Sequence, residues 1–175
     1  PARMGVRGWT PHGASTGAAW LAGALMALAA PAQAQTSTAT FTVTATVLPA
    51  CTVVAGVPLA YGVVTPGVQR DGSVTFTATC TLGTPYTLSL DAGTGSGATV
   101  ASRRMSSAAD SLDYALYLDA ARTSLWGDGT GGTSVRSSTG TGLAQTFTVY
   151  GRVAATAVAP PGAYTDTLTI TAAYR

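Results

Sequence analysis

Apolar and polar side chains alternate without interruption between Thr40 and Val47. Phe41, Val43, Ala45 and Val47 share one parity, and threonines occupy the four positions of the other parity. Because successive side chains of a β-strand point to opposite faces, the pattern predicts a strand with one apolar face and one hydroxyl face. The segment lies ahead of the first cysteine. A strand placed there can complete its own domain or the domain of another chain.

The two-residue period returns in short segments along the rest of the chain. We predict strands at residues 51–55, 74–80, 86–90, 112–118, 141–153 and 165–174, separated by turns that contain Gly, Pro or Asp. Residues 57–64 form an extended, glycine-broken stretch, and residues 91–109, which have no period, form a long loop or a frayed hairpin. About six strands and no confident helix predict an antiparallel β-sandwich or barrel. An immunoglobulin-like sandwich has seven strands, and the spare strand here lies at residues 38–47.

The start of the chain has the pattern of a secretory leader. Arg3 and Arg7 supply positive charge, residues 18–30 form an apolar run, and residues 32–34 (Ala-Gln-Ala) fit a cleavage site. The apolar run is shorter than the ~20 residues of a membrane span. We therefore expect three parts in the 175 residues: a signal peptide (1–34), an N-terminal strand (35–48) and one sandwich domain (49–175). No transmembrane segment is expected after cleavage.

Removal of this leader would change the charge balance. The formal net charge of +2 arises from the leader, and the remainder has seven arginines and seven aspartates with no Lys, Glu or His. A neutral surface without a basic stripe argues against nucleic acid as a partner. We expect an exported protein.

Cys51 and Cys80 are the only cysteines. In an exported protein an even pair predicts a disulfide. It would close a loop of about 29 residues and contribute roughly 3–4 kcal/mol in the chain-entropy model.

Residues for catalysis or metal binding are sparse. Without the leader there is no imidazole base and no set of zinc ligands. Asp110 and Asp113 could be a carboxylate pair but are interpreted as solvated turn residues. The loop that starts at Asp128 has faint similarity to a calcium loop and is interpreted as a plain turn, and Trp126 is interpreted as a core or rim aromatic rather than a sugar platform. We expect no enzyme activity, no catalytic residues, no metal and no cofactor.

Several blocks of sequence resemble the spore coat protein U domain family, which includes subunits of the archaic (Csu-type) chaperone–usher pili. The blocks are residues 114–123 (YALYLDAART), 125–130 (LWGDGT), 149–153 (VYGRV) and 161–168 (PGAYTDTL), together with 41–47 (FTVTATV) leading into 51–53 (CTV). The resemblance covers nearly all of residues 38–175. Residues 93–109 are the least similar part.

The resemblance implies an incomplete immunoglobulin-like β-sandwich of six strands plus a donor strand. A periplasmic chaperone would fill the vacant groove first, and the N-terminal strand of the next subunit would then replace it, with an outer-membrane usher assisting assembly. The donor side chains would be Phe41, Val43, Ala45 and Val47. The last strand would be the edge of the acceptor groove, through Leu168, Ile170, Ala172 and Tyr174.

The leading hypothesis is therefore a structural subunit of a surface pilus, a polymer of identical or homologous subunits. Two alternatives stay open: a self-assembling spore or cell coat protein, and a tip adhesin that binds a surface or carbohydrate. The single domain and the well-formed donor strand favour a shaft subunit. The sequence does not say whether the donor strand enters a neighbour or folds back on its own domain.

Overall fold

The computed structural model describes residues 35–175, so the predicted leader at 1–34 lies outside the described residues. Residues 35–50 contain no strand. Eight strands follow, with bounds β1 Cys51–Val54, β2 Arg70–Cys80, β3 Pro85–Leu90, β4 Arg103–Ser106, β5 Ser111–Tyr117, β6 Arg136–Thr139, β7 Ala144–Val153 and β8 Ile170–Tyr174.

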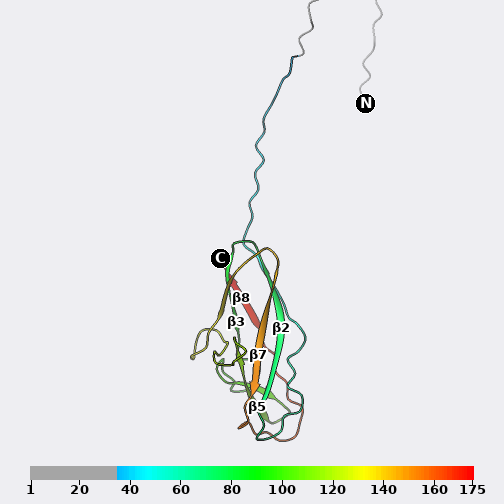
Figure 1. The fold of residues 1–175 in the computed structure, drawn as a ribbon, viewed down its shortest axis with the longest axis vertical. Helices are drawn as coiled ribbons and strands as arrows, with labels where there is room; N and C mark the ends of the chain where they lie inside the picture. Colours follow the sequence, from blue (N-terminus) through cyan, green and yellow to red (C-terminus); the bar gives the residue numbers. More distant parts are fainter. Residues whose placement is uncertain (1–34) are drawn as a thin grey trace, which may run out of the picture. The chain divides into compact units, whose positions relative to one another are not determined.

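The strands form two antiparallel sheets (Figure 1). Five strands make one sheet in the order β1-β2-β7-β5-β4, and the other has the order β6-β3-β8. The alternation in the sequence becomes the burial pattern of each strand. In β2, for example, Phe76, Ala78 and Cys80 are buried, whereas Thr75 and Thr79 are exposed on the other face. The predicted all-β, incomplete immunoglobulin-like sandwich is confirmed.

The core lies between the two sheets and has an aromatic centre. The ring of Phe76 lies 5.6 Å from that of Phe147 and 5.8 Å from that of Trp126, measured between centroids. Trp126 is fully buried, and its Nε1–H donates to the carbonyl of Leu88 at 3.1 Å. Trp126 is thus a core residue with its one donor satisfied.

The strand count differs from the expectation of six. The two additional strands, β4 and β6, have four residues each, and β4 lies inside the segment 91–109, for which we expected a long loop or a frayed hairpin. The last strand begins at Ile170 instead of residue 165; ahead of it, Thr165 makes an isolated bridge with Ser106. Residues 57–64 are not a strand.

A pair of glycines explains how residues 57–64 are held without strand pairing. Gly72 of β2 and Gly151 of β7 are direct partners across the sheet. A Cβ on Gly151 would collide with the hydroxyl of Tyr61 and would lie 2.7 Å from a methyl of Leu59. The missing side chains therefore leave a flat area on the inner face of the sheet, on which Leu59 and Tyr61 pack.

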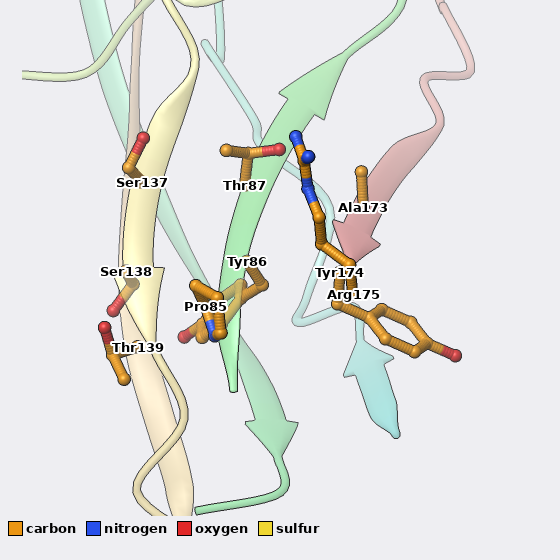
Figure 2. A pocket seen from close by; sticks show the side chains of 9 residues that line it. All are labelled: Pro85, Tyr86, Thr87, Ser137, Ser138, Thr139, Ala173, Tyr174 and Arg175. Atoms are coloured by element: carbon orange, nitrogen blue, oxygen red, sulfur yellow. The ribbon is translucent and has the colours of Figure 1, made fainter. Parts of the chain in front are cut away.

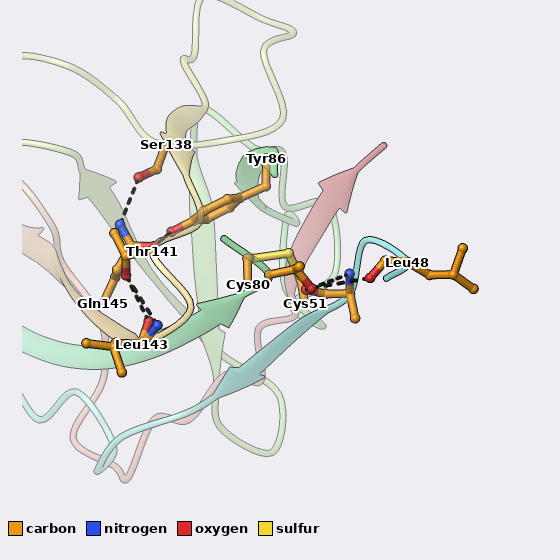
Figure 3. Close-up of a disulfide and its surroundings, with 10 residues drawn as sticks. Leu48, Cys51, Cys80, Tyr86, Ser138, Thr141, Leu143 and Gln145 are labelled. Atoms are coloured by element: carbon orange, nitrogen blue, oxygen red, sulfur yellow. Dashed lines mark hydrogen bonds between the residues drawn. A yellow bond between two sulfur atoms is a disulfide. The ribbon is translucent and has the colours of Figure 1, made fainter. Parts of the chain in front are cut away.

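The disulfide joins the first two strands of the sandwich (Figure 3). Cys51 and Cys80 are direct partners in the β1–β2 ladder, and their sulfurs are 2.07 Å apart. The turn after Cys80 also holds the residues that precede β1. The amide of Thr81 donates to the carbonyl of Ala50 at 2.9 Å, and its Oγ1 accepts from the amide of Ala50 at 3.1 Å.

These contacts define two ends of the sandwich. We call the end with residues 48–50 and the turns at 81–84 and 140–143 the linker end. Its turns are joined by a hydrogen bond from the amide of Gly83 to the carbonyl of Gly140 at 2.8 Å. The opposite end, formed by residues 57–67 and 154–164, is the distal end, where the amide of Gly67 donates to the carbonyl of Ala155 at 3.2 Å.

Candidate strand-accepting groove

Strand β8 is an edge strand. It pairs with β3 over five positions, from Tyr86 opposite Tyr174 to Leu90 opposite Ile170. No strand within residues 35–175 pairs with its other edge. An exposed edge carries a row of free backbone donors and acceptors and is a template for a further strand.

The inward face of β8 is incompletely covered. Its neighbour β3 buries Tyr86, Leu88 and Leu90, which are at most 2% exposed. On the chain leading into and through β8, however, Leu168, Ile170 and Ala172 are only partly buried against the core. Strands β3 and β8 contact the same core. The lower burial of the side chains on and before β8 therefore shows that this part of the core is incompletely covered.

The other wall of the gap is β1. Strand β1 is the edge of the five-stranded sheet and lies beside β8 without a ladder between them. Its inward residues Cys51 and Val53 are also only partly buried. Strands β1 and β8 are therefore adjacent edges, both without a partner strand on that side within residues 35–175, whose inward side chains are apolar and only partly covered; we call this region the candidate groove. Of the proposed edge residues, Leu168, Ile170 and Ala172 are partly buried against the core, and Tyr174 is 45% exposed.

An apolar cleft of about 750 Å³ lies at the distal end. Its walls come from residues 59–66, from residues 157–164 and from Met105 and Leu112. No charged residue lines it. Tyr164 is common to this cleft and to the residues that precede β8, so the cleft is next to the distal end of the groove.

A second depression lies over the three-stranded sheet and differs in chemistry (Figure 2). It is open, and its lining includes hydroxyl side chains of β3 and β6, namely Thr87, Ser137 and Thr139, with Arg175 beside them. Figure 2 shows Thr87 on β3 and Arg175 just after the end of the neighbouring strand β8. The lining mixes these polar groups with apolar ones such as Pro85 and Ala173, and it therefore differs from the wholly uncharged lining of the distal cleft.

The proposed donor residues are outside the core. Phe41, Val43 and Val47 are 86%, 79% and 78% exposed, and Ala45 is exposed as well. The regular series of exposed apolar side chains is thus available for contact with another strand.

Asp166 fixes the chain ahead of β8. Its carboxylate accepts from the amide of Thr94 at 2.7 Å and from the hydroxyl of Tyr114 at 2.6 Å. Burial and this hydrogen bond both raise the pKa of Tyr114 well above its usual value. Asp91 also holds the segment that precedes β8, because its carboxylate accepts hydrogen bonds from the amides of Gly93 and Thr169. Sequence reasoning missed both aspartates, since their partners are distant along the chain.

Arg103 is fully buried beneath these loops. Its guanidinium donates to the carbonyls of Asp91 at 2.8 Å, Trp126 at 2.9 Å and Leu90 at 3.4 Å. Burial lowers the pKa of Arg103. Three carbonyls from two segments thus converge on one cation, which ties the end of β3 to the Trp126 loop.

The other candidate residues have structural partners. Asp113 forms an exposed ion pair with Arg104 at 2.9 Å, and Asp110 lies in a turn with Ser107. The carboxylate of Asp128 accepts from the amide and hydroxyl of Thr130, as in an ordinary turn. Within residues 35–175 no group of three or more His, Cys, Asp or Glu side chains is placed to hold a metal. That part of the chain also has no helix with the length and apolarity needed to span a bilayer.

The fold and the open β1–β8 edge define the class: an immunoglobulin-like sandwich that lacks one strand. Comparison with protein families identifies the family to which the chain belongs. Residues 37–171 match the Spore Coat Protein U domain, and the chain belongs to this family.

Two relatives are informative. Protein U of Myxococcus xanthus is 36% identical over 138 residues, which cover 70% of this chain and 76% of that protein. Among solved structures, the chain is similar to the CsuC–CsuE chaperone–tip adhesion subunit pre-assembly complex of the archaic chaperone–usher Csu pili of Acinetobacter baumannii. The match has a TM-score of 0.51 and 25% identity, and it covers 73% of this chain but 40% of the other.

Proposed function

We propose that this protein is a structural subunit of a surface pilus that assembles by donor-strand complementation through a chaperone–usher pathway. The observation that carries the proposal is the coexistence of an incompletely covered groove along β8 and a separate, exposed apolar strand pattern at residues 40–47. The similarity to a chaperone–subunit complex supports it. On this proposal a chaperone holds the groove until a subunit replaces it, an usher assists polymerisation, and the product is a surface fibre.

The energetics of the two surfaces support a stable fibre. Transfer of Phe41, Val43 and Val47 from water into the groove would contribute about 1.5–3 kcal/mol each as an upper estimate. Hydrogen bonds along the free edge of β8 would add roughly 0.5–1.5 kcal/mol apiece. Even after the cost of ordering the donor, the sum is large for a single junction.

Deletion of residues 35–48 tests this proposal. The shortened chain should keep the Cys51–Cys80 disulfide but should not polymerise. A synthetic peptide of residues 38–48 should bind it and raise its melting temperature, because a ligand of the native state stabilises by mass action. Polymers formed by the shortened chain would show that the donor role is wrong.

The family description favours one second candidate, a self-assembling coat on a spore or cell surface. A coat could use the same groove and donor strand, so the two candidates differ in the assembly pathway. Genes for a chaperone and an usher beside this one would support the pilus. Release of assembled protein from a strain without any usher would support the coat.

A further inference from the structure

The linker end of the sandwich carries exposed apolar side chains that the donor-strand proposal does not use. Leu82 and Leu143 are 76% and 74% exposed on the two turns that the Gly83–Gly140 hydrogen bond holds together. Leu48, at 73% exposed, is at the same end (Figure 3). The segments 81–85 and 139–144 contain no charged residue.

The distal end has a matching character. Val63 and Val158 are 79% and 76% exposed, and Val63 lines the distal cleft together with Pro66, Pro160 and Pro161. Segments 55–69 and 154–163 also lack any charged residue. Contact between these segments of the two ends would therefore bury apolar surface, and the segments themselves carry no charge.

The chain between donor strand and sandwich is too short to keep two subunits apart. From Val47 to Cys51 it can span at most about 14 Å. Thr81 shortens it further, because its hydroxyl donates to the carbonyl of Leu48 at 3.4 Å and its amide binds Ala50. A donor that fills a neighbour's groove up to Val47 thus brings its own linker end against that neighbour.

Strand direction decides which end of the neighbour is met. All named ladders in the described chain are antiparallel, and antiparallel pairing is the more stable kind. Strand β8 runs from the distal end to the linker end, because Tyr174 pairs with Tyr86 just after the turn at 81–84. An antiparallel donor therefore begins at the linker end of the acceptor and leaves the groove toward its distal end.

We propose that Leu82 and Leu143 at the linker end of one subunit pack on the rim of the distal cleft of the next, around Val63. The inference rests on the proposed donor-strand function and adds a second interface to each junction. Such a head-to-tail contact repeats in one direction and does not close on itself, as a fibre requires.

Cross-linking of assembled full-length protein tests the contact. With Cys51 and Cys80 in their disulfide, cysteines introduced by Leu82→Cys and Val63→Cys are the only thiols of residues 35–175. A short bis-maleimide should convert polymers of this double variant into a ladder of multimers that survives boiling and reductant. Leu82→Cys combined with Thr75→Cys, an exposed position in the middle of β2, should give no ladder. Normal polymers without a ladder, or efficient dimers from Leu82→Cys alone, would overturn the contact.

Val43→Asp separates this inference from the donor-strand proposal. The substitution is introduced into the chain that carries Leu82→Cys and Val63→Cys. If the donor-strand proposal and the end-to-end contact are both right, this triple variant forms neither polymers nor a cross-linked ladder. A ladder that persists would refute the donor role and keep the end-to-end contact. As a second readout, Leu82→Asp with Leu143→Asp should lower the temperature at which polymers release subunits, while Thr75→Asp should not. An unchanged release temperature would count against the contact.

Discussion

Two neighbouring substitutions in the N-terminal strand should differ greatly in their effect on assembly. Val43 lies on the apolar parity of residues 40–47 and Thr42 on the hydroxyl parity. If residues 40–47 insert as a strand, Val43→Asp places a carboxylate in the groove, whereas Thr42→Asp places it on the outer face. Charge and size are the same, so only the strand phase separates the two variants.

The expected loss of binding free energy in Val43→Asp follows from the surfaces that the side chain would contact. The inward side chains of the candidate groove, among them Leu168, Ile170 and Val53, are apolar and form no ion pair with an introduced aspartate. The variant loses the burial of Val43, about 1.5–3 kcal/mol, and incurs a further few kcal/mol for an unpartnered polar group. A total of about 5 kcal/mol corresponds to between three and four powers of ten in the dissociation constant.

A peptide assay measures this directly. Peptides of residues 38–48 with either substitution are titrated into the chain that lacks residues 35–48, and binding is followed by calorimetry or by the shift in melting temperature. The Thr42→Asp peptide should bind within about threefold of the parent, since an exposed substitution changes free energy by ~0.5 kcal/mol. Equal weakening by both substitutions would refute the assigned phase.

Three further predictions concern the sandwich itself and are measured by urea denaturation of residues 35–175. Cys51→Ser should lower the free energy of unfolding by about 3–4 kcal/mol, less if the unfolded chain is compact. Arg103→Met should lower it by roughly 3–5 kcal/mol because three buried carbonyls lose their donor, whereas Arg104→Met, which breaks an exposed pair, should cost less than about 1 kcal/mol. A hydrogen bond from Arg152 lowers the pKa of Asp71 in the folded state. The stabilisation that this carboxylate provides is present above its unfolded pKa of about 3.9 and is lost as the pH falls through the lower folded pKa. Asp71→Asn should therefore make the free energy of unfolding less dependent on pH in the acid range.

The central strands could be predicted because one face of each is buried and the other is solvated. In β3 and β5 the apolar residues recur at every second position, from Tyr86 to Leu90 and from Leu112 to Leu116. Strands β4 and β6 could not be predicted, because Arg-Arg-Met-Ser and Arg-Ser-Ser-Thr show no such period. They are four-residue strands at sheet edges, defined by their partners rather than by their own sequence.

Residues 57–64, expected to be an extended and glycine-broken stretch, form no strand in the structure. Val57, Leu59 and Tyr61 alternate as in a strand, and yet only Leu59 and Tyr61 pack inward, onto the glycine pair of β2 and β7. The burial of Arg103 could not be predicted from the sequence, because a lone arginine is almost never fully buried. Its burial depends on three carbonyls brought together by the fold. In the groove, the phase of the donor strand could be read from the sequence, but the incomplete cover of β8 required the structure.

The position of Thr81 bears on whether the donor strand acts on its own domain or on a neighbour. Thr81 holds Ala50 and the carbonyl of Leu48 at the linker end, where β8 also ends. A donor that folded back along its own β8 would have to finish at this end and would therefore run parallel to β8. In the groove of a neighbour it is free to run antiparallel, with the more stable ladder. The pinned linker therefore disfavours self-complementation, and we infer that residues 40–47 act in trans.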